Sequence, residues 1–283
     1  MTRLLQIAPF VFSFLAIATS SAHSDSIDDI TKRHTINLGY RTDAAPFSSM
    51  DGTNRPSGFS VELCLRIAAA VGRETGQPIA PVFVPVGTSD RFDALTQKKI
   101  DIECGATTVT LKRRELVDFT LFTFVTGGTL MVRTKGPQPD LESGANPKIG
   151  VLNNTTSEAA LKRLSATRNL KIEIVPVDTH DIAIGFLTSG VLDGYFADRD
   201  LLWDRRNKAA DPSAFAISDT LMTYEPYALP IRRGDDRLRL IGDRTLAELY
   251  RSGEILRLIE RWFPNAKPSN MLIALYFMQS LDE

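Results

Sequence analysis

The sequence predicts an α/β protein of two lobes, each a mostly parallel sheet flanked by helices, joined by two strand-like crossings. Strand-like and helix-like segments alternate in the first half of the chain, and the alternation restarts after a Gly- and Pro-containing stretch at 134–147. A late amphipathic segment at 238–262 has apolar positions that need a sheet to cover. Alternating strands and helices are typical of parallel sheets, so the repeated pattern predicts two of them.

Local patterns place the individual elements. The strands expected in the first half are 34–41, 81–86 and 100–104, followed by a longer β-rich segment at 122–133. The helices expected between them are 60–71 and 89–99. The strands expected in the second half are 148–152, 171–177, 194–198 and 227–233, with helices beginning near 156 and 181 and the late helix at 238–262.

The late helix is expected to cover the first sheet, which makes the first lobe discontinuous. We expect the chain to cross between lobes near Met131 and Tyr227. The first lobe then comprises 34–131 and 227–270, the second comprises 132–226, and 271–283 is a C-terminal tail to which we assign no function. Two strand-like crossings of this kind act as a hinge.

The first 22 residues have the layout of a secretory signal peptide. Arg3 precedes an apolar run at 4–18, and small residues follow up to Ala22. A run this short is at the lower limit for spanning a bilayer. We therefore expect cleavage after Ala22 and a periplasmic protein.

Charge and cysteine content narrow the function classes. Lys and Arg total 33 against 34 Asp and Glu, so there is no overall field for binding nucleic acid. Cys64 and Cys104 are the two cysteines; they either form a disulfide after export or are two small buried side chains. Two cysteines and three histidines do not favour a metal site, and we expect no metal and no cofactor.

A turn after the strand at 100–104 carries groups suited to a carboxylate. Gly105 is followed by Thr107 and Thr108, and Arg113 lies on the short segment after them. Ligands of open α/β sheets bind at this edge of the sheet, and main-chain N–H groups and a guanidinium hold carboxylates well. The alternative is a Thr-rich turn with a solvated arginine.

The second lobe offers a matching pair of features. Thr155 and Glu158 have the spacing of a capping box, and helix N-termini attract anions. Asp198 ends the strand at 194–198 and can be either the counter-charge of an ammonium group or a helix cap. Taken singly, Arg41, Arg91 and His180 are ordinary loop or cap residues.

Together, these motifs resemble one known family. The segments GYR…APFS, GFSVEL, KKIDIECGATT, TTSE and GYFAD occur in the order found in the type II periplasmic amino-acid-binding proteins of ABC transporters, and most closely in their glutamate/aspartate-binding branch. The resemblance extends from about residue 34 to 262. It implies the type II periplasmic-binding-protein-like fold. It also implies a monomer that closes on glutamate or aspartate and delivers it to a membrane permease.

The resemblance also implies a role for each site residue. Arg113, with the backbone near Thr108 and Thr156, would hold the α-carboxylate, and Thr107 and Thr155 are counted among the ligand-binding residues beside them. Asp198 and the Ala106 carbonyl would receive the α-ammonium, although the family usually has Ser in place of Ala106. Arg41, Arg91 and His180, with Thr88 nearby, would hold the side-chain carboxylate. Three arginines against Asp198 suit a ligand of net negative charge, unless Asp43 and Asp90 neutralise Arg41 and Arg91.

Other functions remain open at this point. A neutral polar amino acid would fit if the two aspartates neutralise the arginines. A cyclohexadienyl dehydratase that acts on prephenate or arogenate resembles the same family, and it would need an acid to protonate a leaving hydroxyl. Glu103 and Glu158 are the motif glutamates, and each also has a structural interpretation. We predict no catalytic residue, and we rank a sensory ectodomain lower because the chain shows no signalling domain.

Overall fold

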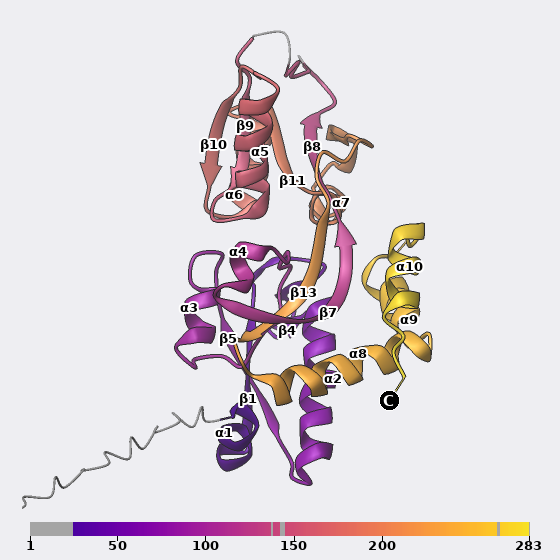
Figure 1. Ribbon diagram of the computed structural model, residues 1–283. Helices are drawn as coiled ribbons and strands as arrows, with labels where there is room; N and C mark the ends of the chain where they lie inside the picture. Colours follow the sequence, from indigo (N-terminus) through magenta and orange to yellow (C-terminus); the bar gives the residue numbers. More distant parts are fainter. Residues whose placement is uncertain (1–24, 137, 142–144, 265–266, 283) are drawn as a thin grey trace, which may run out of the picture.

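The computed structural model describes residues 25–136, 138–141, 145–264 and 267–282, and these form two lobes (Figure 1). Each lobe contains a five-stranded sheet with helices on both faces, which confirms the predicted α/β, two-lobed fold class. The expected signal peptide at 1–22 lies outside the described residues. In the part of the chain that is described, no helix has the length and apolar character needed to cross a membrane.

The sheet of the first lobe has the strand order β5-β1-β6-β13-β7. These strands are β1 (Thr35–Tyr40), β5 (Ala80–Pro85), β6 (Ile102–Glu103), β7 (Val117–Thr126) and β13 (Glu225–Arg232). The first three in chain order, β1, β5 and β6, are parallel, whereas β13 is antiparallel to both of its neighbours. The sheet is therefore mixed, because the strand that returns from the second lobe enters it in the opposite direction.

The second sheet repeats this plan with the order β10-β9-β11-β8-β12. Its strands are β8 (Gly128–Arg133), β9 (Lys148–Leu152), β10 (Glu173–Val177), β11 (Gly194–Asp198) and β12 (Phe215–Ile217). β9, β10 and β11 are parallel, and β8 is antiparallel to β11 and β12. A small separate sheet follows β1 and comprises β2 (Asp43–Ala44), β3 (Ser48–Met50) and β4 (Pro56–Ser57).

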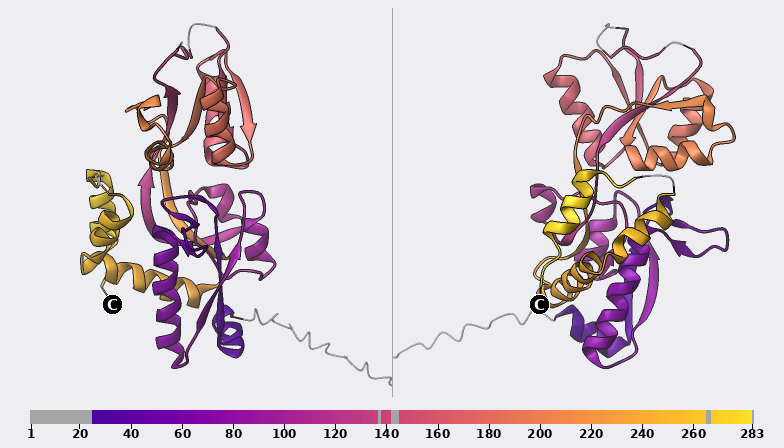
Figure 2. Two further views of the ribbon diagram at one scale, coloured as in Figure 1. Left: turned by 180° about the vertical axis from the view of Figure 1, so that it is seen from behind. Right: turned by 90° about the vertical axis from the view of Figure 1, so that its right-hand side faces the viewer.

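Helices cover both sheets. Those of the first lobe are α1 (Ser26–Arg33), α2 (Phe59–Thr75), α3 (Arg91–Thr96), α4 (Leu111–Arg114), α8 (Asp236–Arg251), α9 (Glu254–Trp262) and α10 (Asn270–Met278). Those of the second lobe are α5 (Thr156–Thr167), α6 (His180–Ser189), α7 (Arg199–Lys208) and the 3₁₀ turn η1 (Pro212–Ala214). Figure 2 shows the C-terminal helix α10 beside the first lobe, where the Tyr276 hydroxyl donates to the Thr123 carbonyl at 2.9 Å.

Helix α2 buries one continuous face against the first sheet. Its buried positions recur at helical spacing from Phe59 to Val71 and include Cys64. Cys64 forms a disulfide with Cys104, and the two Cα atoms are 6.1 Å apart. Of the two alternatives for the cysteines, a disulfide or two buried side chains, the structure contains the disulfide. This bond ties α2 to the loop that follows β6.

The expected single helix at 238–262 is two helices. The break occurs at Gly253, whose φ of +71° lies in the left-handed region that glycine adopts without strain. Leu256 follows the break and lies off the buried positions of α9, and Leu240 lies off the buried positions of α8. Both leucines were expected to face the sheet, and they are 38% and 50% exposed. Assigning these two leucines to the core was wrong.

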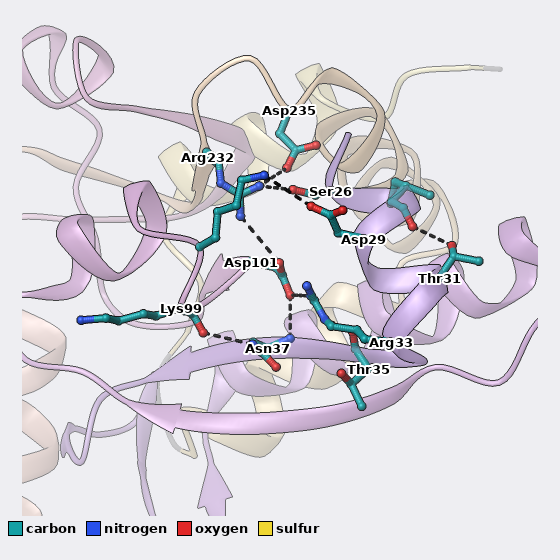
Figure 3. Close-up of polar contacts among 12 residues, drawn as sticks. Ser26, Asp29, Thr31, Arg33, Thr35, Asn37, Lys99, Asp101, Arg232 and Asp235 are labelled. Atoms are coloured by element: carbon teal, nitrogen blue, oxygen red, sulfur yellow. Dashed lines mark hydrogen bonds and ion pairs between the residues drawn. The ribbon is translucent and has the colours of Figure 1, made fainter. Parts of the chain in front are cut away.

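A buried polar network anchors the N-terminal helix α1 (Figure 3). This helix is not among the elements that were predicted from the sequence. Asp101 is 1% exposed, accepts the Asn37 N–H at 2.7 Å and forms an ion pair with Arg33 of α1. Arg232 lies 3.8 Å from the same carboxylate and donates to the Ser26 hydroxyl. A buried carboxylate is stable when it is paired in this way, so the network fixes α1 against the first sheet.

Two adjacent chain segments connect the lobes. β7 ends at Thr126 in the first sheet and β8 begins at Gly128 in the second, with only Gly127 between them. A Cβ atom on Gly127 would lie 2.1 Å from the carbonyl oxygen of Thr223 on the returning segment, so only glycine allows this approach. Figure 1 shows β13 running beside β7 and β8 between the lobes. We propose that the hinge and the lobe boundaries lie here, four residues before the expected crossing at Met131.

Candidate functional site

The candidate site is a cavity between the lobes, at the carboxyl ends of the parallel strands of both sheets. Loops that follow strands of this kind converge at one edge of an α/β sheet, and the two edges here face each other. Nine of the residues expected at the site line the cavity: Arg41, Arg91, Ala106, Thr108, Arg113, Thr155, Thr156, His180 and Asp198. They follow β1, β5, β6, β9 and β10 or, in the case of Asp198, end β11, so all six parallel strands contribute.

Two expected site residues do not line this cavity. Thr88 lies in a neighbouring groove together with Arg41 and Asn153. Thr107 is fully buried, and its hydroxyl donates to Oε2 of Glu103 at 2.7 Å. The Thr107 side chain is thus directed into the first lobe, whereas that of Thr108 reaches the cavity.

One end of the cavity presents donors suited to an anion. Thr155 caps α5 by accepting the Glu158 N–H at 3.1 Å, and the Glu158 carboxylate accepts the Asn154 N–H at 2.8 Å. The capping box is thus present, with its reciprocal bond one residue earlier than in the standard form. The N–H groups of Thr156 and Ser157 have no intrahelical partner by position, and both residues line the cavity.

Arg113 approaches the same end from the first lobe. Its guanidinium donates to the Thr108 carbonyl at 2.7 Å, and its carbon Cζ lies 5.4 Å from the centre of the Phe92 ring. Burial lowers the pKa of Arg113, and the nearby carboxylates of Glu225 and Glu103 act in the opposite direction. The side chain is held in place while other N–H groups remain available to a ligand.

Asp198 is the acidic residue of the lining. It is 6% exposed, and its carboxylate accepts bonds from the Ser157 hydroxyl at 3.1 Å and from the Tyr227 hydroxyl. Burial, followed by the negative charge of Glu225, raises its pKa to about 7, while both hydrogen bonds act in the opposite direction. A cation brought next to this carboxyl group would favour its ionised form, as the ammonium group of an amino acid does.

The opposite end of the cavity contains two buried arginines with different partners. Arg41 is 4% exposed and pairs with Asp43 at 2.6 Å, as the sequence had suggested. Arg91 is 2% exposed, and Asp90 does not pair with it; the Asp90 carboxylate accepts the Gly87 N–H at 2.6 Å instead. Among the described residues Arg91 forms no ion pair, and its Nε has no hydrogen-bond partner. Burial lowers its pKa to about 9, partly offset by the negative charge of Glu103.

His180 completes this end of the cavity as a neutral side chain. It is 3% exposed, and its Nδ1 lies 2.6 Å from the Tyr195 hydroxyl. Burial lowers the pKa of His180 to about 3. The imidazole therefore contributes hydrogen bonding to the site and no charge.

Contacts between the lobes close the cavity, and two of the residues that make them, Glu225 and Arg205, were not expected at the site. The Thr108 and Thr156 hydroxyls are 3.2 Å apart, and Thr156 donates to Glu225 at 2.7 Å. On the other side, Arg205 of α7 donates to the Asp43 carbonyl. Glu225 and Arg205 carry no motif signal, because their partners are far away in sequence and meet them only when the lobes approach.

Comparison with known proteins agrees with this architecture. The L-glutamate/L-aspartate-binding protein of Pseudomonas aeruginosa is 28% identical over 274 residues, which cover 93% of this chain and 90% of that protein. The glutamate/aspartate import solute-binding protein of Escherichia coli is 28% identical over 252 residues, 89% of this chain and 83% of that protein.

Solved structures show the same fold. A mutant of ArgBP from T. maritima has a TM-score of 0.75 at 24% identity and covers 84% of this chain and 99% of that chain. An ancestral amino acid-binding protein, described as a precursor of cyclohexadienyl dehydratase, has a TM-score of 0.72 at 27% identity and covers 85% and 100%. The family model of the bacterial extracellular solute-binding proteins, family 3, matches residues 36–265. With this match over most of its length, the chain belongs to the bacterial extracellular solute-binding proteins of family 3.

Proposed function

We propose that this protein captures glutamate or aspartate in the periplasm by closing its two lobes, and delivers the amino acid to the permease of an ABC transporter. Export by the leader at 1–22 and action as a monomer are part of the proposal. The main observation in support of this function is the buried guanidinium of Arg91, because among the described residues this cation forms no ion pair. Burying a cation that has no ion-pair partner is costly, and a ligand carboxylate at this end of the cavity would reduce that cost.

The charges of the lining agree with an acidic ligand. Arg41, Arg91 and Arg113 line the cavity together with one carboxyl group, that of Asp198. A glutamate or aspartate would bring two carboxylates and one ammonium group to these positions. The relatives from Pseudomonas aeruginosa and Escherichia coli named above bear the same ligands in their names.

Closure requires that the ligand bind the closed form more tightly than the open form. The second lobe supplies the first turn of α5, Asp198 and His180, while the first lobe supplies the three arginines. A ligand held by both sets contributes contacts that exist only when the lobes meet. The contacts Thr108 to Thr156 and Arg205 to Asp43 form in the same movement.

Binding without chemical conversion is the function we propose for this site. One solved structure with the same fold is an ancestral amino acid-binding protein described as a precursor of cyclohexadienyl dehydratase, so turnover of prephenate or arogenate is the competing activity. Glu103 is fully buried, and one of its carboxylate oxygens is bonded to Thr107. Glu158 caps α5. We expect no turnover of either compound, and turnover that a Glu103→Gln substitution abolishes would replace the binding function by an enzymatic one.

A thermal-shift screen of the twenty amino acids tests the ligand class. Protein freed of bound solute by unfolding and refolding should be stabilised by glutamate or aspartate alone. At a ligand concentration of about 1,000 times Kd the stabilisation is about 4 kcal/mol, or roughly 8–16 °C in Tm for a chain of this size. A shift of this size with arginine or glutamine, and none with the acids, would refute the acidic assignment.

Ligand affinity should fall as the pH is lowered through 7. The ammonium group of the ligand pairs with the ionised form of Asp198, whose pKa is raised to about 7, so a proton must be released before binding at lower pH. Between pH 8 and pH 6 we expect a loss of about tenfold, since the coupling involves one proton. Calorimetry in buffers of different ionisation enthalpy measures both the affinity and the proton release. An affinity that rises on acidification would contradict this coupling.

A further inference from the structure

The buried hydrogen bond between His180 and Tyr195 bears on which ring nitrogen of His180 carries the proton. His180 is the first residue of α6 and lines the cavity, whereas Tyr195 lies within β11 and is fully buried. The Tyr195 hydroxyl and Nδ1 of His180 are 2.6 Å apart, with the two ring planes inclined at 73°. With Nδ1 engaged inside the lobe, Nε2 is the ring nitrogen left for a ligand.

The direction of this hydrogen bond follows from the chemistry of its two members. Burial raises the pKa of Tyr195 well above its usual value, so the hydroxyl keeps its proton, and burial keeps His180 neutral. Among the described residues, the Tyr195 hydroxyl has no hydrogen-bond partner other than His180. If Nδ1 carried the imidazole proton, the buried hydroxyl proton would have no acceptor, which is unfavourable. Tyr195 therefore donates to Nδ1, and the imidazole proton is on Nε2.

Resting on the proposed function, we propose that Tyr195 is a positioning residue that determines selectivity, because it fixes His180 as the neutral Nε2–H tautomer. The described polar side chains that line this end of the cavity, Arg41, Arg91 and His180, then offer donors only. A carboxylate satisfies these donors, since both of its oxygens accept. The amide nitrogen of glutamine or asparagine would meet only other donors there, and an unpaired polar group of this kind gives strong discrimination.

The charged groups around His180 do not replace Tyr195 in this role. Asp43 of β2 is paired with Arg41, and Arg205 of α7 donates to the Asp43 carbonyl. Asp43 favours protonation of the imidazole, whereas Arg205 and Arg41 oppose it. None of the three forms a hydrogen bond with the ring among the described residues, so the tautomer depends on the Tyr195 hydroxyl.

The tautomer can be observed directly by nitrogen NMR of the histidine side chains in the ligand-free protein. The sequence has three histidines, so a His180→Gln variant assigns the signals. We expect Nε2 of His180 to be protonated and Nδ1 unprotonated, unchanged between pH 5 and pH 8. Tyr195→Phe should produce a mixture of tautomers or a ring that titrates in this range. An Nδ1–H tautomer in the unmodified protein, or an unchanged tautomer in Tyr195→Phe, would overturn the proposal.

The effect on selectivity is measured by titrating the variants with glutamate and glutamine. Relative to the unmodified protein, Tyr195→Phe should reduce the ratio of the two affinities at least tenfold, because Nε2 can then accept from an amide. Tyr250→Phe is the matched control: it removes another buried hydroxyl, which donates to the Phe122 carbonyl at 2.9 Å outside the cavity. An unchanged ratio with an altered tautomer would refute the selectivity role. A preference for a neutral or cationic ligand, with the Nε2–H tautomer observed, would refute the proposed function and leave the tautomer assignment intact.

Discussion

Replacing Asp198 by asparagine should weaken the binding of every amino acid by at least about 30-fold. The substitution keeps the shape of the side chain, and its amide oxygen can accept from either Ser157 or Tyr227 while the amide NH2 donates to the other hydroxyl, but it removes the counter-charge of the ligand ammonium group. Loss of one partner of a buried charge pair costs about 2–5 kcal/mol, which is about 30-fold to several thousand-fold in affinity. Calorimetric titration with glutamate measures the loss.

Asp236→Asn is the control for this substitution. It makes the same change in charge at an exposed carboxylate in the first turn of α8. Asp198→Asn should remain folded, because the raised pKa of Asp198 means that the protein already tolerates the neutral form at this position. Binding by Asp198→Asn within threefold of the unmodified protein would show that Asp198 does not meet the ammonium group.

Replacing Arg91 by methionine should remove most of the preference for an acid over its amide. Methionine keeps much of the length and apolar character of the arginine stem, so the packing beneath Phe92 changes little. Glutamate affinity should fall about 100-fold, in line with the loss of roughly 3 kcal/mol of charge-assisted bonding. Glutamine affinity should change by less than about tenfold, since an amide gains far less from a cation.

Two measurements accompany the Arg91 variant. Arg257→Met removes an exposed positive charge from α9 and should leave both affinities unchanged. The ligand-free Arg91→Met protein should be at least as stable as the unmodified one, because it no longer buries a cation that lacks an ion-pair partner among the described residues. Equal losses of glutamate affinity and glutamine affinity would mean that Arg91 supports the fold and does not distinguish a charged ligand from a neutral one.

The positions of the site residues were predictable because of how parallel strands are arranged. In the β-α pattern each parallel strand ends at the same edge of its sheet, so residues at or just after the strand ends, such as Arg41, Thr108 and Asp198, must converge. The same reasoning cannot orient adjacent side chains in a turn. Thr107 and Thr108 look equivalent in the sequence, yet one bonds to Glu103 inside the lobe and the other reaches the cavity.

Contacts that depend on how separate elements pack could not be predicted from the sequence. Tyr227 was expected as part of an apolar crossing strand, and its hydroxyl reaches Asp198 of the other lobe. Tyr195 has the pattern of a core position on β11, and only the position of α6 shows its hydrogen bond to His180.

The helix α1 could have been predicted from the sequence, since Asp25 caps it and it has acidic residues in its first turn and basic residues in its last.

Calorimetric titration of the ligand-free protein with glutamate, aspartate and glutamine, side by side at pH 8, tests the acidic specificity most directly. We predict that glutamate or aspartate binds with a micromolar Kd or tighter, about −8 kcal/mol, and that glutamine binds at least about 100-fold more weakly. Tight binding of glutamine with no response to either acid would contradict the specificity inferred from the buried Arg91.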